Sequence, residues 1–412
     1  MHVAALELRA RLEALPGMER LLPELDGLPP AYLVGGAVRD LLRGAESVDL
    51  DLVLEGDARS ASRELAARLG GEAVEHERFG TATVRARELW LDLATARRER
   101  YRSPGALPEV EPAPIEADLG RRDFTINAMA VALSGGERGR VLDPYGGRAD
   151  LDAGVVRVLH RHSFIDDPTR ILRAVRYEAR LGFAMDRDTA ALAAAAVADG
   201  VFDTVSGTRI GNELLLVLGE GRRREALARL ADLGVDRALD PSLSFDADLA
   251  GSAARAAEVI GADPALAALA ALLLPRPEAL VPWLDGLGLD ASARERTLRA
   301  SRTAPSLPDA LSDDLARSEL HRLLRDEPPE VLALAIALGA PSDPISLYLD
   351  RLTDVRLEIS GDDLVAAGVA PSPTLGRALD GTLRRKLDGA LAGREEELRC
   401  ALALARDEDP GA

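Results

Sequence analysis

The feature that most constrains the fold is a short apolar run that ends in two glycines and continues into a helical pattern. Residues 32–34 are apolar, Gly35 and Gly36 follow, and residues 38–42 have the composition of a first helical turn. A strand that turns through glycines into a helix leaves backbone N–H groups exposed at the helix N-terminus, where they attract anions such as phosphates. The sequence therefore predicts a strand, turn and helix that can hold a phosphate group.

Two aspartates follow this turn. Asp49 and Asp51 lie at positions i and i+2 of the next predicted strand, so their side chains project from the same face. Carboxylate oxygens suit Mg²⁺, and two ions held ~3.5–4 Å apart can stabilise the attacking and leaving oxygens of a phosphoryl transfer. Arg39 adds a positive charge beside the glycines. Taken separately, the glycines indicate a tight turn and the aspartates a solvated loop. In this order they predict a metal site at which a nucleotide is transferred.

Length and composition limit the class of protein. A chain of 412 residues that is 47% hydrophobic can form more than one domain around a sizeable core. Cys400 is the single cysteine, which excludes an intrachain disulfide and is typical of a reducing compartment. We find neither an apolar stretch of the ~20 residues that cross a bilayer nor a signal pattern. We therefore expect a cytoplasmic protein with no membrane contact.

Hydrophobic periodicity predicts an α+β fold. Apolar spacing over residues 6–22 predicts a leading helix within residues 1–30. Strand-like runs then alternate with helical patterns up to about residue 160, which indicates a mixed α/β domain. The runs are residues 32–34, 49–54, 81–84, 89–94, 130–133 and 155–158. Beyond them the pattern is helical, notably over residues 172–181, 190–198, 210–218, 223–233 and 311–323.

Several motifs in order resemble the class II tRNA nucleotidyltransferase and poly(A) polymerase group of the polymerase β-type nucleotidyltransferases. After the glycines and aspartates come RRDFTINA at 121–128, LDPYGG at 142–147, DDPTR at 166–170, and ISGDDL at 359–364 with Gly368 and Gly376. The resemblance covers nearly the whole chain and is strongest over residues 33–183. It implies a nucleotidyltransferase head (31–160), a helical neck with a nucleobase template (161–220), a helical body (221–310) and a helical tRNA-binding tail (311–412).

A third acid is Asp92, which lies in the strand-like run 89–93. A carboxylate among apolar residues is costly if it is buried without a partner. The resemblance implies that Asp92 faces Asp49 and Asp51 and completes the catalytic set. An ion pair between Asp92 and Arg97 is the alternative.

The segment 121–128 combines arginines with an aspartate and an asparagine. Guanidinium forks suit phosphate oxygens, and Asp or Asn side chains can bond ribose hydroxyls. The resemblance implies that Arg122 contacts the triphosphate, together with Gly35, Gly36 and Arg39, and that Asp123 and Asn127 select ribose. A helix cap at Asp123 is compatible with this role.

Asp167 precedes a proline and predicts the start of a helix that carries Arg170, Arg173 and Arg176 on one stripe. Such a stripe is usually solvated surface. The resemblance instead implies that Asp167 and Arg170 pair with the base edge of CTP or ATP, and that the other two arginines bind the nucleotide. The family usually has glutamate where this chain has Asp166.

Residues 97–114 are rich in proline and charge, so we expect an exposed loop without regular structure. The segment resembles the family's flexible loop, which helps to switch addition from C to A and is missing from forms that add only two cytidines. Its presence favours complete CCA addition.

The resemblance thus implies an enzyme that adds CCA to the tRNA 3′ end from CTP and ATP, with Mg²⁺ as cofactor and no evident obligate protein partner. Poly(A) polymerase, an A-only or a CC-only enzyme are alternatives, and ERFGTA at 77–82 favours the CCA-adding subgroup over the polymerase. A non-catalytic RNA-binding module is disfavoured because the acids are present. A small-molecule nucleotidyltransferase would leave the helical half unexplained.

The net charge of −18 is unusual for a protein that binds RNA, because lysine and arginine normally neutralise phosphate charge. The positive charge is clustered, however, at residues 97–98, 121–122, 170–176 and 222–224. These clusters can form a local basic cleft, although 222–224 can equally be a solvated helix face. We therefore expect weak RNA binding that depends strongly on salt.

Overall fold

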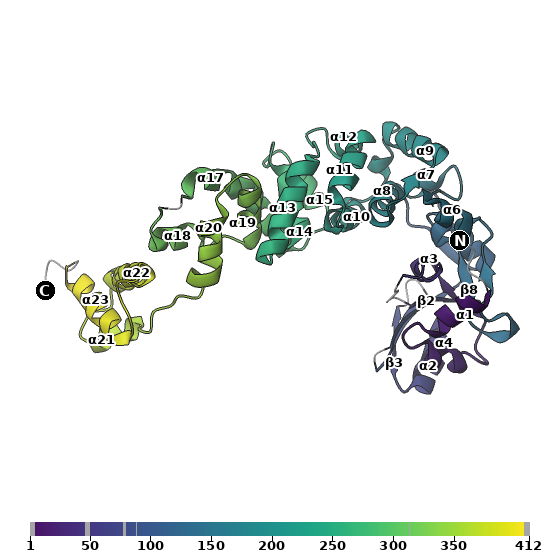
Figure 1. Cartoon of the computed structure of the whole chain (residues 1–412), viewed down its shortest axis with the longest axis horizontal. Helices are drawn as coiled ribbons and strands as arrows, with labels where there is room; N and C mark the ends of the chain where they lie inside the picture. The colour runs from purple at the N-terminus through teal and green to yellow at the C-terminus, as the bar shows by residue number, and fades with distance from the viewer. Residues whose placement is uncertain (1–4, 46–49, 77–79, 88, 313, 408–412) are drawn as a thin grey trace. The chain divides into compact units, whose positions relative to one another are not determined.

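The computed structural model describes residues 5–45, 50–76, 80–87, 89–312 and 314–407. Asp49 and the first part of the ERFGTA segment therefore lie outside the described residues. The chain forms two compact units, Met1–Pro241 and Ser242–Ala412 (Figure 1). A sheet with helices makes up much of the first unit, and the described part of the second is helical, which confirms the predicted α+β class.

A seven-stranded sheet has the order β3-β4-β5-β2-β1-β8-β9. Its strands are β1 (Ala31–Val34), β2 (Leu50–Leu54), β3 (Glu72–His76), β4 (Thr81–Ala86), β5 (Leu89–Thr95), β8 (Ala130–Ala132) and β9 (Val141–Leu142). Strands β2 and β5 run parallel, and the other neighbours run antiparallel. The predicted run at 155–158 is the short strand β10 (Val155–Val156), which pairs with β11 (Ala184–Met185) outside this sheet.

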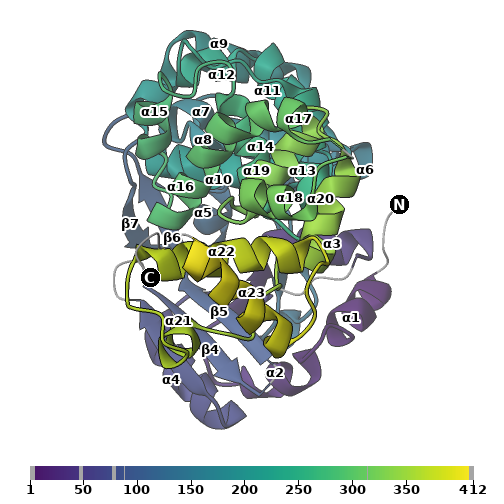
Figure 2. The same ribbon diagram turned by 90° about the vertical axis from the view of Figure 1, so that its left-hand side faces the viewer.

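One face of the sheet is covered by helices. These are α1 (Ala5–Glu13), α2 (Met18–Glu24), α3 (Gly36–Arg43) and α4 (Ala58–Leu69). Helix α4 lies against β4 and β5 (Figure 2). Leu21 and Leu65 from these helices meet Leu52 and Leu91 from the strands in one fully buried cluster. Burial of this apolar surface stabilises the strands that carry the site residues.

The predicted single helix over residues 6–22 is wrong, because the chain breaks it into α1 and α2. Gly17 adopts a left-handed conformation with φ 81° between them. A Cβ atom there would lie 2.4 Å from Leu89 Cδ1, so only glycine permits this approach to β5. The apolar spacing continues across the break, so hydrophobic periodicity alone predicts one continuous helix.

The opposite face of the sheet is only partly covered. Helix α5 (Ile115–Gly120) packs Ile115 and Leu119 against Val34 and Val53. On β2, Leu50, Leu52 and Leu54 point into the other core, so Asp51 between them is exposed on this second face. The alternation of the strand therefore presents a carboxylate on the open face.

The expectation of an irregular loop over residues 97–114 is also wrong. Strands β6 (Arg97–Arg100) and β7 (Glu109–Pro112) pair antiparallel, with Arg98 opposite Glu111 and Arg100 opposite Glu109. The charges of β6 alternate in exposure, and Glu99 is almost fully buried. Pro112 lies in a two-stranded sheet, in which each strand is an edge strand that tolerates a missing N–H. We refer to residues 97–112 as the β6–β7 hairpin.

Helices complete the first unit. They are α6 (Gly147–Ala153), α7 (Ser163–Asp166), α8 (Thr169–Leu181), α9 (Arg187–Ala198), α10 (Gly207–Gly219), α11 (Arg223–Asp232) and α12 (Val235–Leu239), with 3₁₀ turns at Thr125–Asn127, Gly135–Glu137 and Val201–Thr204. The predicted helical patterns at 172–181, 190–198, 210–218 and 223–233 fall on α8 to α11, with the last pattern one residue longer than α11.

The second unit consists of short helices in its described part. They are α13 (Ala247–Ile260), α14 (Pro264–Leu273), α15 (Val281–Gly286), α16 (Ala291–Thr303), α17 (Leu307–Ala310), α18 (Arg317–Leu324), α19 (Pro329–Ala337), α20 (Ser342–Leu347), α21 (Gly361–Ala366), α22 (Pro373–Leu387) and α23 (Arg394–Asp407), with a 3₁₀ turn at Ala304–Ser306 and a π-helical turn at Tyr348–Leu352. The predicted helix at 311–323 is wrong in its first half, because α17 ends at Ala310 and α18 begins at Arg317. Ser312 and Asp314 between them favour turns over helix interiors.

Within the described residues, no helix combines the length and apolarity that a membrane span needs. The division of the molecule at Pro241 falls inside the segment 221–310 that we predict to be the body. The four-part division into head, neck, body and tail stays a prediction.

Candidate active site

The glycine turn shapes one wall of a cavity. Gly35 caps α3 with φ 67° and ψ −133°, a conformation that side chains rarely adopt. A Cβ atom at Gly35 would lie 2.9 Å from Arg122 Nη1. The turn thus brings the Gly35 backbone next to the Arg122 guanidinium, and both residues line the cavity.

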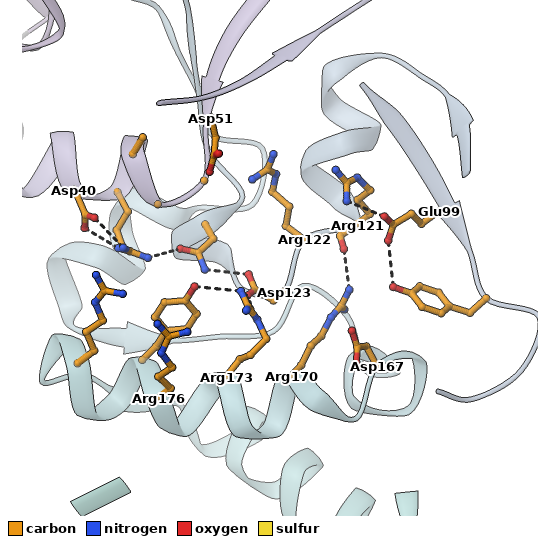
Figure 3. A pocket seen from close by; sticks show the side chains of 18 residues that line it. Asp40, Asp51, Glu99, Arg121, Arg122, Asp123, Asp167, Arg170, Arg173 and Arg176 are labelled. Atoms are coloured by element: carbon orange, nitrogen blue, oxygen red, sulfur yellow. Dashed lines mark hydrogen bonds and ion pairs between the residues drawn. The ribbon is translucent and has the colours of Figure 1, made fainter. Parts of the chain in front are cut away.

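A cavity of about 480 Å³ lies between the sheet, α3 and α8. Figure 3 shows Asp51, Arg122, Asp123 and the arginines of α8 pointing toward it. All the predicted nucleotide-binding residues line it: Gly35, Gly36, Arg39, Arg122, Asp123, Asn127, Asp167, Arg170, Arg173 and Arg176. The fold therefore gathers residues from four separate sequence motifs around one space, which we call the nucleotide cavity.

Asp51 and Asp92 are direct neighbours in the parallel pair of β2 and β5. Adjacent strands lie ~5 Å apart, and both side chains are exposed on the open face. Asp92 Oδ1 accepts a hydrogen bond of 2.6 Å from the Thr83 hydroxyl, while Arg97 pairs with Glu99. The two carboxylates thus present hard oxygen donors at one place.

Asp51 lies on the wall that two cavities share. Asp92 does not line the nucleotide cavity but a second cavity of about 390 Å³, and the two cavities share Asp51, Arg121 and Arg122. The residues that the structure describes, from which Asp49 is missing, hold no cluster of three His, Cys, Asp or Glu side chains placed to bind a metal. Among the described residues, Asp51 and Asp92 are therefore the two predicted catalytic acids that lie side by side on the open face of the sheet.

A chain of hydrogen bonds crosses the floor of the nucleotide cavity. Arg39 Nη1 donates to Asn127 Oδ1 at 2.8 Å, and Asn127 Nδ2 donates to Asp123 Oδ1 at 3.0 Å. Asp123 Oδ2 then accepts from Arg173 Nη2 at 2.7 Å and from Nε at 2.9 Å. Asp123 also accepts from the Phe124 amide at 2.8 Å. Both Asp123 oxygens are thus engaged within the protein, but the turn at Thr125–Asn127 is preceded by Phe124 and has no side-chain cap, so the predicted cap at Asp123 is wrong.

Asp123 and Arg173 in this hydrogen-bond chain stabilise each other's charged forms. Burial by itself would raise the pKa of Asp123, but the charge of Arg173 and the hydrogen bonds from Asn127 and Arg173 outweigh it and hold that pKa below its ordinary value. Burial lowers the pKa of Arg173, and the charge of Asp123 more than compensates, so the pKa of Arg173 is raised. The pair is ionised at neutral pH.

The predicted template pair lies at the start of α8. Asp167 Oδ1 accepts from the Thr169 amide at 3.1 Å and from its hydroxyl at 2.6 Å, which confirms the predicted helix start. Arg170 is only 5% exposed, and it donates to the Ser163 hydroxyl at 2.7 Å and to the Arg121 carbonyl at 2.8 Å. The solvated-stripe alternative is therefore wrong for Arg170, whose guanidinium is fixed by the protein.

Comparison with known proteins identifies the family. Residues 31–157 match the Poly A polymerase head domain. Over 391 residues the chain is 36% identical to the A-adding tRNA nucleotidyltransferase of Halalkalibacterium halodurans, and the match covers 92% of this chain and 90% of that protein. The chain belongs to the tRNA nucleotidyltransferase family. The resemblance predicted from the motifs is thereby confirmed.

Other members of this nucleotidyltransferase family are similar over most of the chain. The CC-adding enzyme of Deinococcus radiodurans is 33% identical over 385 residues, covering 92% of this chain and 90% of that protein. The A-adding enzyme of Geobacter sulfurreducens is 34% identical over 419 residues, which are 91% of this chain but 45% of that protein. The chain therefore spans less than half of the Geobacter relative.

Solved structures of the family have the same fold. A CCA-adding enzyme in an apo form superposes with a TM-score of 0.82 at 30% identity, covering 98% of this chain and 100% of the other. The Thermotoga maritima CCA-adding enzyme complexed with tRNA superposes with a TM-score of 0.77 at 31% identity, covering 98% and 99%.

Arg209 on α10 of this nucleotidyltransferase contacts the predicted template but is not among the residues predicted from the sequence. Arg209 Nη2 pairs with Asp167 Oδ2 at 2.7 Å, and its Nη1 donates to the Gly105 carbonyl at 3.1 Å in the turn of the β6–β7 hairpin. The Gly105 amide in turn donates to the Ile165 carbonyl at 3.3 Å. Arg209 thus joins the hairpin to the predicted template. No local pattern signals this role, because its partners are far away in the chain.

Glu99 and Tyr101 of the hairpin are likewise not among the site residues predicted from the sequence. Glu99 Oε1 accepts from Arg121 at 2.8 Å and from Arg97 at 3.1 Å, and Glu99 Oε2 accepts from the Tyr101 hydroxyl at 3.2 Å. Burial, with the nearby charge of Glu99, raises the pKa of Tyr101 to about 12 against the opposing charge of Arg170. Tyr101 is therefore a neutral donor on the wall of the nucleotide cavity.

Proposed function

We propose that this protein adds C, C and A to the 3′ end of tRNA from CTP and ATP and releases pyrophosphate. The observation that carries the proposal is the meeting of the glycine turn, Asp51 and the Asp167–Arg170 pair around one cavity. The relatives named above add C, A or both to tRNA, and the Thermotoga enzyme binds tRNA. Work on tRNA also favours a cytoplasmic location, which we include in the proposal.

The triphosphate is held between the glycine turn and the arginines in this proposal. Arg122 Nη2 donates to buried Asp118 at 3.1 Å, but Arg122 Nε is buried with no hydrogen-bond partner among the described residues. A buried unsatisfied donor costs about 1–3 kcal/mol. A phosphate oxygen would satisfy it, and the N–H groups that follow Gly35 would bind the same anion.

The acids fit a divalent metal such as Mg²⁺. Asp51 and Asp92 offer oxygen donors from neighbouring strands, and we propose that Asp49 completes the set. When bound, such an ion supplies charge neutralisation at the reacting phosphate. The residues themselves position the substrates, because direct attack by the RNA 3′ hydroxyl requires no covalent enzyme intermediate.

Base choice follows from the chemistry of the template pair. A carboxylate such as Asp167 accepts from the exocyclic amino group that C and A share, and a guanidinium such as Arg170 donates to a ring nitrogen or carbonyl. Arg170 is fixed through Ser163 and Arg121, so its remaining N–H groups have a defined direction. U and G lack an amino group at the matching position and are disfavoured.

We expect Arg170→Ala to blur base choice more than it weakens tRNA binding. Loss of one base-edge contact corresponds to about 1–3 kcal/mol, or roughly 5- to 150-fold in discrimination. The measurement is single-nucleotide incorporation with each of the four triphosphates, beside a tRNA binding titration. Arg170→Lys keeps the positive charge but lacks the planar fork of the guanidinium, so it should stay folded and still discriminate poorly between bases. Arg187→Ala, an exposed arginine on α9, is the control, and equal base ratios in all these proteins would refute the template role.

Addition of A alone is a second candidate. The A-adding relatives from Halalkalibacterium and Geobacter align with 92% and 91% of this chain. CC-only addition is less favoured, because the segment resembling the flexible loop is present. An acceptor that ends before its first C separates the two candidates, since only the complete enzyme extends it.

A further inference from the structure

The open face of the sheet extends past the carboxylates to an exposed tryptophan. On β5, Leu89, Leu91 and Leu93 are buried, so Trp90 and Asp92 both point to the open face. Trp90 is 62% exposed and lies ~7 Å along the strand from Asp92. A large aromatic ring thus stands on the same surface as the predicted catalytic acids.

An arginine accompanies this ring. Arg85 on β4 is the cross-strand partner of Trp90, and its guanidinium carbon lies 4.6 Å from the ring centroid. Thr83 and Asp92 form the next pair on the same face, joined by their hydrogen bond. The stacked pair and the acid are therefore neighbours on one face of a two-stranded ladder.

A second cavity lies beside the Thr83–Asp92 end of this ladder, and neither Trp90 nor Arg85 lines it. The second cavity runs from Asp51 and Asp92 to Thr83, Thr81 and His76 on β3 and β4. It shares Asp51 with the nucleotide cavity but has neither the glycine turn nor the template pair among its lining residues. A second substrate that lies over β4 and β5 would reach Asp92 without contacting the glycine turn or the template pair.

We propose that Trp90 and Arg85 form a stacking platform for a base of the single-stranded RNA 3′ end, next to the nucleotide whose 3′ hydroxyl reaches Asp92. The proposal rests on the proposed function. Aromatic stacking suits this occupant because it tolerates any base, and the base at this position changes as each nucleotide is added. The guanidinium adds a positive charge for the RNA backbone on a protein of net charge −18. Isolated exposed apolar residues are common, but here the ring is paired with a guanidinium and adjoins the acids.

Kinetics provide the first test. Stacking is worth about 1–3 kcal/mol per base, so Trp90→Ala should raise KM for the acceptor RNA by roughly 5- to 150-fold and leave KM for ATP unchanged. Trp90→Phe should keep most of the affinity, and Arg85→Ala should give a smaller rise. Leu216→Ala removes a 44% exposed apolar side chain from α10 of the same unit and should change nothing. An unchanged KM for RNA in Trp90→Ala would overturn the platform.

Fluorescence provides a test that does not depend on turnover. The chain has two tryptophans, Trp90 and Trp283, so Trp283→Phe leaves Trp90 as the sole emitter. An RNA hairpin ending in an unpaired CC should quench this emission, whereas the same hairpin without its unpaired end should bind with little quenching. Binding of both RNAs with identical emission would overturn the proposal.

The same two measurements distinguish a failure of the platform from a failure of nucleotide transfer. If Trp283→Phe extends the RNA while Trp90 emission does not respond, the platform is wrong and the proposed function stands. If the unaltered protein extends no RNA, the proposed function fails and the platform falls with it.

Discussion

Asp51→Asn is expected to lower the rate of nucleotide transfer by about 1,000-fold or more while the protein stays folded. The amide has the shape of the carboxylate but lacks the charge that a divalent metal requires. Asp51 is exposed on the open face of the sheet, so this change leaves the cores on both faces of β2 intact. The loss should therefore appear in kcat, with little change in tRNA affinity.

The measurement is single-turnover incorporation of AMP into a tRNA that ends in CC, together with a urea unfolding curve and a tRNA binding titration. Glu116→Gln, which neutralises an exposed carboxylate on α5 of the same unit, is the matched control and should retain full activity. Near-normal turnover in Asp51→Asn would show that this carboxylate is not part of the chemistry.

Asp123→Asn should destabilise the first unit by about 2–4 kcal/mol. Removal of one partner of a buried ion pair leaves the other charge uncompensated, and this usually costs about 3–5 kcal/mol. Asp123 is only 9% exposed, while Arg173 also pairs with Glu213 at 3.0 Å, which moderates the loss. The change also interrupts the hydrogen-bond chain from Arg39, so nucleotide binding should weaken as well.

The difference in unfolding free energy between Asp123→Asn and the unaltered protein should depend on pH. The folded-state pKa of Asp123 lies below its ordinary value of about 4, so its contribution is fully present above pH 4 and is lost as pH falls through the folded pKa. Urea unfolding of both proteins at pH 7 and below pH 4 measures this. Glu225→Gln removes an exposed ion pair with Arg222 and should change the free energy of unfolding by no more than about 1 kcal/mol. Equal midpoints for Asp123→Asn and the unaltered protein at pH 7 would contradict the buried-pair interpretation.

Local sequence patterns located the parts of the site that depend on strand alternation and helix starts. Asp51 is recognisable because Leu50 and Leu52 flank it with buried side chains, and Asp167 because it caps a helix. Periodicity failed where tertiary contacts decide the structure. The break at Gly17 exists because α2 must clear Leu89, and the apolar spacing is unaffected by it.

Contacts across long sequence separations were out of reach for the same reason. Arg209 holds both Asp167 and Gly105, and Arg170 reaches the carbonyl of Arg121. The hairpin of β6 and β7 was hidden by its prolines and charges, although Glu99 becomes buried by pairing with Arg97 and Arg121. Such residues carry no local signal, because their environment is created only when distant elements pack together.

The most direct test of nucleotide transfer at this cavity uses three tRNA acceptors that end at the discriminator base, after the first C, or after the second C. Each is incubated with the purified protein and Mg²⁺, with CTP and ATP singly and together. We predict extension of every acceptor to CCA when both triphosphates are present, and addition of A alone to the CC-ended acceptor with ATP. Extension of the CC-ended acceptor alone would select the A-only candidate, whereas failure to extend any of the three would contradict nucleotide transfer to tRNA by this protein.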